Sequence, residues 1–171
     1  MKILITYMSL TGNTEKIAEA IYEEIREGKE IIEFSEVTSL KDYNLIFLGF
    51  PMHGFAAPED MEKFMNKNCR GKMIALFITH GAPDDSPELP PWLEKCKEAA
   101  VGAEVVGMFN CQGELAQDVI DALLASDNLR HREYGKHGDT TIGQPDESRL
   151  ERARQFARDM VDKLSETHPI N

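Results

Sequence analysis

The sequence predicts an α/β fold in three layers, a sandwich in which a doubly wound, five-stranded parallel sheet lies between two layers of helices. Strand-like apolar runs alternate with helical patterns along the 171-residue chain. Two of these runs, at 44–50 and 73–79, are almost continuously apolar, as is typical of strands covered on both faces. This alternation favours parallel strands joined by right-handed helical crossovers, and by itself it leaves the strand order open.

The first part of the chain predicts three strands and two helices. Ile17, Ile21 and Ile25 recur every four residues, which indicates one buried helical face. Gly28 is the expected stop signal of that helix, and Pro58 is expected at the start of the next one. The expected elements are strand 2–8, helix 13–27, strand 29–34, strand 44–50 and a helix through 58–65.

The rest of the chain predicts two further strands and three helices. The last helix is the best patterned, because one face carries Leu150, Ala153, Ala157, Met160, Val161 and Leu164. The expected elements are strand 73–79, a helix through 92–100, strand 104–110, helix 115–124 and helix 147–164.

The segment 126–145 is polar and shows no clear period. It holds the one basic cluster of the chain: Arg130, His131, Arg132, Lys136 and His137. A structureless stretch of this length is uncommon in a compact domain unless it is functional. The alternatives are a solvated surface loop, a small hairpin, a lid over a ligand, or an element that selects a partner.

Composition excludes some classes of protein. The formal net charge of -11 argues against a nucleic-acid partner, because nucleic acids require a basic surface. Cys69, Cys96 and Cys111 are odd in number and far apart, which is typical of reduced cytosolic thiols and gives no zinc-ligand spacing. With no transmembrane-length apolar run and no signal-peptide pattern, we expect a single cytoplasmic domain over 1–171 that uses neither membrane nor metal.

The turn after the first strand is the most informative stretch. It consists of Ser9, Leu10, Thr11, Gly12, Asn13 and Thr14, and a helical pattern follows at once. Hydroxyls, backbone N–H groups and a helix N-terminus together form a phosphate site. No Lys or Arg lies between Lys2 and Lys16, and no G-x-G-x-x-G is present, which excludes the nucleotide-hydrolysing and dinucleotide-binding loops. A single terminal phosphate monoester is the expected ligand.

This run resembles the flavodoxin signature, [S/T]-x-T-G-x-T, in the same position after the first strand. The resemblance implies a flavodoxin-like fold with strand order 2-1-3-4-5 and flavin mononucleotide (FMN) as cofactor. It assigns the FMN phosphate to the loop Ser9–Thr14. It also implies that the loops after strands three and four hold the isoalloxazine ring of the flavin between them.

The ring-binding residues that this resemblance implies fall in two loops. They are Pro51, Met52, His53, Gly54 and Phe55 in the second loop, and Thr79, His80, Gly81 and Ala82 in the third. The second loop lacks the tryptophan and the third loop lacks the tyrosine of well-known flavodoxins, so the stacking partners are not identified. Gly54 is the expected site of the family's peptide flip, with a plain turn glycine as the alternative.

Four side chains in or near these loops have two interpretations each. His53 and His80 are either cations beside the reduced ring or exposed loop histidines. Trp92 either covers the flavin or packs against the helix after the third loop. For Cys111 a buried thiol is favoured over a redox role.

The expected function is that of a one-electron carrier between redox partners, without catalytic residues. The alternatives are an FMN-dependent NAD(P)H:quinone-type oxidoreductase, with His53 or His80 as proton donor, and a binding module without redox turnover. A basic redox partner is expected to dock on an acidic rim beside the ring loops. The rim residues are Glu59, Asp60, Glu62, Asp84, Asp85 and Glu88.

Overall fold

The computed structural model describes residues 1–26 and 28–167, and it confirms the predicted sheet. Five parallel strands pair in the order β2-β1-β3-β4-β5. In the centre of the sheet Ile5 lies beside Ile31 on one side and Phe47 on the other. The strands are β1 (Ile3–Tyr7), β2 (Lys29–Glu33), β3 (Leu45–Pro51), β4 (Met73–His80) and β5 (Glu104–Gln112).

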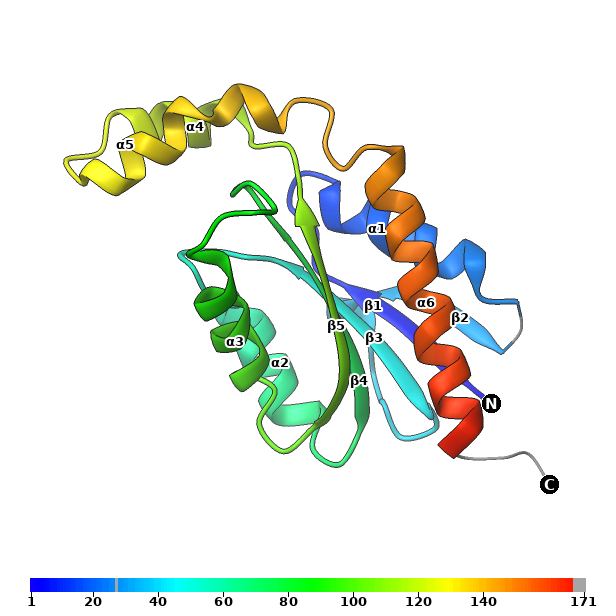
Figure 1. The fold of residues 1–171 in the computed structure, drawn as a ribbon. Coiled ribbons are helices and arrows are strands. Elements are labelled where there is room, and N and C mark those ends of the chain that lie inside the picture. Colours follow the sequence, from blue (N-terminus) through cyan, green and yellow to red (C-terminus); the bar gives the residue numbers. More distant parts are fainter. Residues whose placement is uncertain (27, 168–171) are drawn as a thin grey trace.

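Helices cover both faces of this sheet (Figure 1). One face packs against α1 (Asn13–Glu24) and α6 (Glu147–Thr167), and the other against α2 (Glu59–Asn68) and α3 (Leu89–Glu98). Because side chains alternate along a strand, each strand contributes to both cores. Phe47 and Phe77 pack on the α1 side, whereas Leu48 and Leu76 pack on the α2 side.

The end of the first helix differs from the prediction. α1 ends at Glu24, and Glu27 lies outside the described residues. Ile25 takes an extended conformation (φ -73, ψ 126) and buries its side chain in the core, which ends the helix early. Gly28 does not cap α1: its φ is +65 and its carbonyl accepts a hydrogen bond from the Ile3 N–H, so it leads the chain into β2.

The segment 126–145 is helical, so the surface-loop and small-hairpin interpretations were wrong. It forms α5 (Leu129–Lys136) and a 3₁₀ turn, η2 (Gly138–Thr141). The Asn128 side chain caps α5 by accepting a hydrogen bond from the Arg130 N–H at 2.9 Å. The prediction missed this helix because α5 is polar and has no buried apolar face, only a buried glycine.

α5 pairs with α4 (Gln117–Leu124) to form a helical hairpin. The hairpin lies beyond the carboxyl end of β5, outside the two helical layers (Figure 1). Two glycines allow α5 and the turn η2 to approach α4 closely. A Cβ on Gly135 would lie 2.9 Å from Leu124, and one on Gly138 would lie 2.7 Å from Ile120. In the part of the chain that the structure describes, no helix is long and apolar enough to cross a membrane.

Candidate functional site

The loop after β1 closes around the first turn of α1. Gly12 is the N-cap of the helix at φ +89, a conformation that side chains rarely adopt. The Ser9 hydroxyl accepts hydrogen bonds from the Gly12 N–H at 3.1 Å and from the Glu15 N–H at 3.3 Å. The first N–H groups of a helix have no intrahelical acceptor. The Ser9 hydroxyl therefore marks the position at which an oxygen of an anion could accept hydrogen bonds from the Gly12 and Glu15 N–H groups.

Two side chains predicted to face the phosphate also have structural partners. The Thr14 hydroxyl lies 2.8 Å from the Thr79 hydroxyl, in a buried pair that joins α1 to the end of β4. The Asn13 side-chain amide donates to the Glu114 carbonyl at 2.8 Å and to the Thr11 hydroxyl at 3.2 Å. Asn13 thus connects the first loop to the segment after β5. The predicted loop residue Leu10 is 73% exposed.

The second loop is a tight turn. His53 and Ala56 exchange backbone hydrogen bonds at 2.9 and 3.2 Å across Gly54 and Phe55. Gly54 has φ +58 and Phe55 has φ +65, which is the pattern of a type I′ turn. Positive φ is uncommon for a bulky residue such as phenylalanine and costs on the order of 1–3 kcal/mol. Gly54 therefore lies in a strained turn, next to a side chain that would prefer negative φ.

The third loop contains a buried histidine. His80 is 6% exposed, so the exposed-histidine interpretation was wrong for this residue, whereas His53 is exposed. The His80 Nδ1 lies 3.0 Å from the Ala82 carbonyl, and its Nε2 lies 3.0 Å from Oδ1 of Asn110. Burial lowers the pKa of His80, while Asn110 and Asp84 oppose that shift. Both ring nitrogens are engaged by the protein.

A cavity of about 530 Å³ lies against the second and third loops. Its wall includes Phe55 and Trp92, whose rings are 4.4 Å apart, and Tyr134 from α5, whose ring is 5.7 Å from that of Trp92. Trp92 thus packs on Phe55 as well as lying beside the cavity. Residues of α4 also line this cavity, among them Val119 and Leu123, and the ring-loop prediction did not include them. The apolar spacing in 115–124 was the available signal for it.

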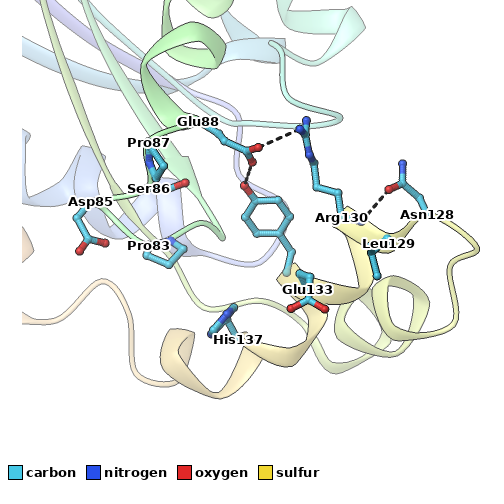
Figure 2. A pocket seen from close by; sticks show the side chains of 11 residues that line it. Pro83, Asp85, Ser86, Pro87, Glu88, Asn128, Leu129, Arg130, Glu133 and His137 are labelled. Carbon is cyan, nitrogen blue, oxygen red and sulfur yellow. Dashed lines mark hydrogen bonds and ion pairs between the residues drawn. The ribbon is translucent and has the colours of Figure 1, made fainter.

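Two of the six rim carboxylates, Asp84 and Glu88, connect different segments of the chain. Asp84 accepts a hydrogen bond from the Gln112 N–H at 2.7 Å and pairs with Arg149 at 3.1 Å. Glu88 pairs with Arg130 at 3.0 Å and accepts from the Tyr134 hydroxyl at 2.5 Å, so it connects the third-loop segment to α5 (Figure 2). Asp84 therefore connects the third loop to β5 and α6, whereas Glu88 connects the same segment to α5.

The remaining acidic residues lie nearer to solvent. Glu59 and Asp60 are exposed in the first turn of α2, where both lie near Lys63. Asp85 is exposed and points away from α5 (Figure 2). Glu62 is half-buried. The side chains available to a partner are therefore fewer than the sequence indicated.

The three cysteines are buried and free. Burial raises the pKa of Cys69, Cys96 and Cys111 to about 12 in each case, so all three thiols stay protonated at neutral pH. The expected buried thiol at Cys111 is confirmed. Among the described residues, no group of three His, Cys, Asp or Glu side chains could hold a metal ion.

The fold and the loops at its carboxyl edge are those of a flavodoxin-like α/β protein, in which ligands bind where the strand order reverses. Residues 4–158 match the model of a family described as the flavodoxin domain, and the chain belongs to that family. A relative from Clostridioides difficile (strain CD3), the flavodoxin-like domain-containing protein BilS, is 32% identical over 175 residues, which cover 96% of this chain and 99% of the relative.

Solved flavodoxin structures have the same fold. A flavodoxin from the domain Archaea aligns with a TM-score of 0.60 at 23% identity, covering 96% of this chain and 99% of its own. Flavodoxin 2 from Bacillus cereus aligns with a TM-score of 0.59 at 26% identity, covering 95% and 99%. A flavoprotein from Lactobacillus acidophilus, solved in complex with FMN, aligns with a TM-score of 0.50 at 24% identity, covering 64% and 92%.

Proposed function

We propose that this protein binds FMN and carries electrons between redox proteins. The observation that carries the proposal is the first loop, where the Ser9 hydroxyl accepts the N–H groups of Gly12 and Glu15. These donors start a helix whose dipole favours a negative group at the same place. A phosphate oxygen that replaced the Ser9 hydroxyl would accept hydrogen bonds from the same two N–H groups. The Ser9 hydroxyl could then donate a hydrogen bond to the phosphate.

The residues present fit the rest of FMN as well. The first loop offers uncharged donors, which suits a phosphate monoester. The cavity beside the second and third loops is lined mainly by apolar and aromatic side chains, as small-molecule sites are. When bound, the flavin would supply the electron-transfer chemistry, and the protein would supply its orientation and electrostatic environment.

The state of His80 supports a carrier over an NAD(P)H:quinone-type oxidoreductase. An enzyme of that kind would use a side chain near the ring as proton donor. The ring nitrogens of His80 are engaged by Ala82 and Asn110, and its burial disfavours the charged form. His53 is exposed at the tight turn. The carrier role requires neither residue to move a proton.

The partner is proposed to be a protein with a basic docking surface. The acidic residues proposed to meet it are the exposed Glu59, Asp60 and Asp85. Glu59 and Asp60 pair only with the exposed Lys63 of the same helix among the described residues, whereas Asp84 and Glu88 connect different segments. Opposite charges around a docking site accelerate encounter more than they strengthen the complex. The net charge of -11 also favours faster encounter with a basic partner.

A flavin titration tests the cofactor assignment. The purified apoprotein is titrated with FMN and, separately, with riboflavin, and binding is followed by quenching of flavin fluorescence. We expect one FMN per chain and a preference for FMN over riboflavin of at least about a hundredfold, or about 2.7 kcal/mol, because riboflavin leaves several oriented donors without a charged acceptor. Equal affinity for the two flavins would contradict the assignment of the first loop.

A further inference from the structure

An apolar stripe follows one face of the segment that contains α4. Leu115, Val119, Ala122 and Leu123 have the spacing of a single helical face, and all four line the cavity beside the second and third loops. None of the side chains of α4, a helix that lies wholly within the described residues, is buried. Val119, for example, is 43% exposed. A short helix is normally stabilised by burying such a stripe, so the stripe is built to meet something in the cavity.

The other walls of the cavity identify what that occupant is. Met52 to Phe55 and His80 to Ala82 line the same space, and these are the two loops to which the flavin ring is assigned. The volume of about 530 Å³ lies within the range of about 300–1,000 Å³ usual for small-molecule sites. An apolar stripe facing aromatic side chains suits a flat, largely apolar ring system.

We infer that α4 forms one wall of the flavin-ring site, with Leu115, Val119 and Leu123 in contact with the isoalloxazine ring. The inference rests on the proposed function, because it takes FMN as the ligand. It also accounts for the third loop, which has no large aromatic side chain. A Cβ on Gly81 would lie 2.5 Å from Cδ2 of Leu115, so the Leu115 side chain occupies the space beside the glycine.

Contacts at both ends of the hairpin hold this wall in place. At its base the Leu115 N–H donates to the Thr141 hydroxyl at 3.1 Å, and the Glu114 N–H donates to the Gln144 carbonyl at 3.0 Å. At its far end Glu88 binds α5 through Arg130 and Tyr134 (Figure 2). The stripe therefore faces the ring loops before any ligand binds, and the hairpin is a lid fixed at two points.

Leu124 provides a matched control for the stripe. It lies in the same helix as Val119 and has the same exposed fraction, 43%. It does not line the cavity, because it packs over Gly135 of α5 instead. A polar substitution at Leu124 therefore tests the stability of the hairpin, whereas one at Val119 or Leu123 tests contact with the ring.

The test compares Val119→Asn, Leu123→Asn and Leu124→Asn in the full chain. Affinity is measured for FMN and for lumiflavin, which has the ring but no phosphate. We expect Val119→Asn and Leu123→Asn to weaken the binding of both ligands by about tenfold, equivalent to about 1.4 kcal/mol, and Leu124→Asn by less than about threefold. Unchanged affinity in the first two variants, or an equal loss in Leu124→Asn, would overturn the inference.

A second measurement uses the unaltered protein and does not depend on how the variants fold. On FMN saturation, ring-current shifts are expected at the methyl resonances of Val119 and Leu123, and none at Leu129, which is 64% exposed and lies away from this cavity. FMN binding without shifts at Val119 and Leu123 would overturn the inference and leave the proposed function intact. Shifts caused by lumiflavin in a protein with no preference for FMN would support the inference and contradict the phosphate assignment.

Discussion

The first loop and the α4–α5 hairpin form opposite ends of the proposed site and are built differently. Contacts within one short stretch join Ser9, Gly12 and Glu15 of the loop, and two further side chains connect it to β4 and to the segment after β5. The hairpin comes from a distant part of the sequence and is held at its base by Leu115 and at its far end by Glu88. The end proposed for the phosphate therefore depends mostly on local backbone geometry, and the end proposed for the ring depends on side chains that the fold brings together.

The largest expected effect is a difference between two threonines: substituting Thr14 should lower stability, and substituting Thr11 should weaken FMN binding. Thr14→Val should lower the free energy of unfolding by about 1–3 kcal/mol, because it leaves the buried Thr79 hydroxyl without its partner. Thr11→Val is the matched control: Thr11 is exposed, and its hydroxyl accepts a hydrogen bond from the half-buried Asn13 rather than from a buried side chain. It should weaken FMN binding by about tenfold and leave the unfolding midpoint unchanged. Urea unfolding of both apoproteins and FMN titrations measure this difference.

A smaller effect is expected at the far end of the hairpin. Glu88→Gln should accelerate amide hydrogen exchange in α4 and α5 by up to about fivefold, because a partly exposed ion pair contributes up to about 1 kcal/mol. Exchange in β1, β3 and β4 should not change. The control is Glu133→Gln, since Glu133 pairs with Lys136 within α5 itself. If the two variants exchange alike, Glu88 does not fix the hairpin.

The sequence predicted the local end of the site better than the distant end. The order of the elements, the sheet and the position of the first loop all followed from patterns within short stretches. Asn13 and Thr14 were predicted to face the phosphate. The structure places both in the first turn of α1, and their partners Glu114 and Thr79 depend on the fold. No local pattern could show these pairs.

The ring end was harder to predict for the same physical reason. α5 is polar and bears no apolar stripe, so periodicity gave no signal for it. The contact of Glu88 with Tyr134 joins residues far apart in the chain. The apolar spacing of 115–124 did predict a helix there, and only the fold showed that its stripe faces the cavity beside the ring loops.

Acid should act on the third loop before it acts on the carboxylates. Burial lowers the pKa of His80 in the folded protein below its ordinary value of 6.5. The stability that neutral His80 contributes is therefore present above pH 6.5 and is lost as the pH falls below it. We expect the free energy of unfolding to decline as the pH falls below 6.5, before the carboxylates begin to titrate. Urea unfolding at several pH values should give a flatter dependence on pH for His80→Gln than for the unaltered protein.

The smallest effect concerns the partner. Reversing Asp60 and Asp85 to lysine should slow electron transfer between the FMN-loaded protein and a basic flavoprotein reductase, and should flatten its dependence on salt. Exposed charges act over about 10 Å at 0.1 M salt, so the effect falls mainly on the association rate. FMN affinity should not change. Stopped-flow rates that respond neither to salt nor to reversal would leave the acidic residues with no docking role.

One measurement tests both ends of the site together. Backbone amide resonances of the isotope-labelled protein are followed during titration with FMN, with lumiflavin and with inorganic phosphate. We expect phosphate to shift the Gly12 to Glu15 amides, lumiflavin to shift the second and third loops and α4, and FMN to shift both sets. Saturation with FMN that leaves the Gly12 to Glu15 amides unmoved would contradict the proposed site.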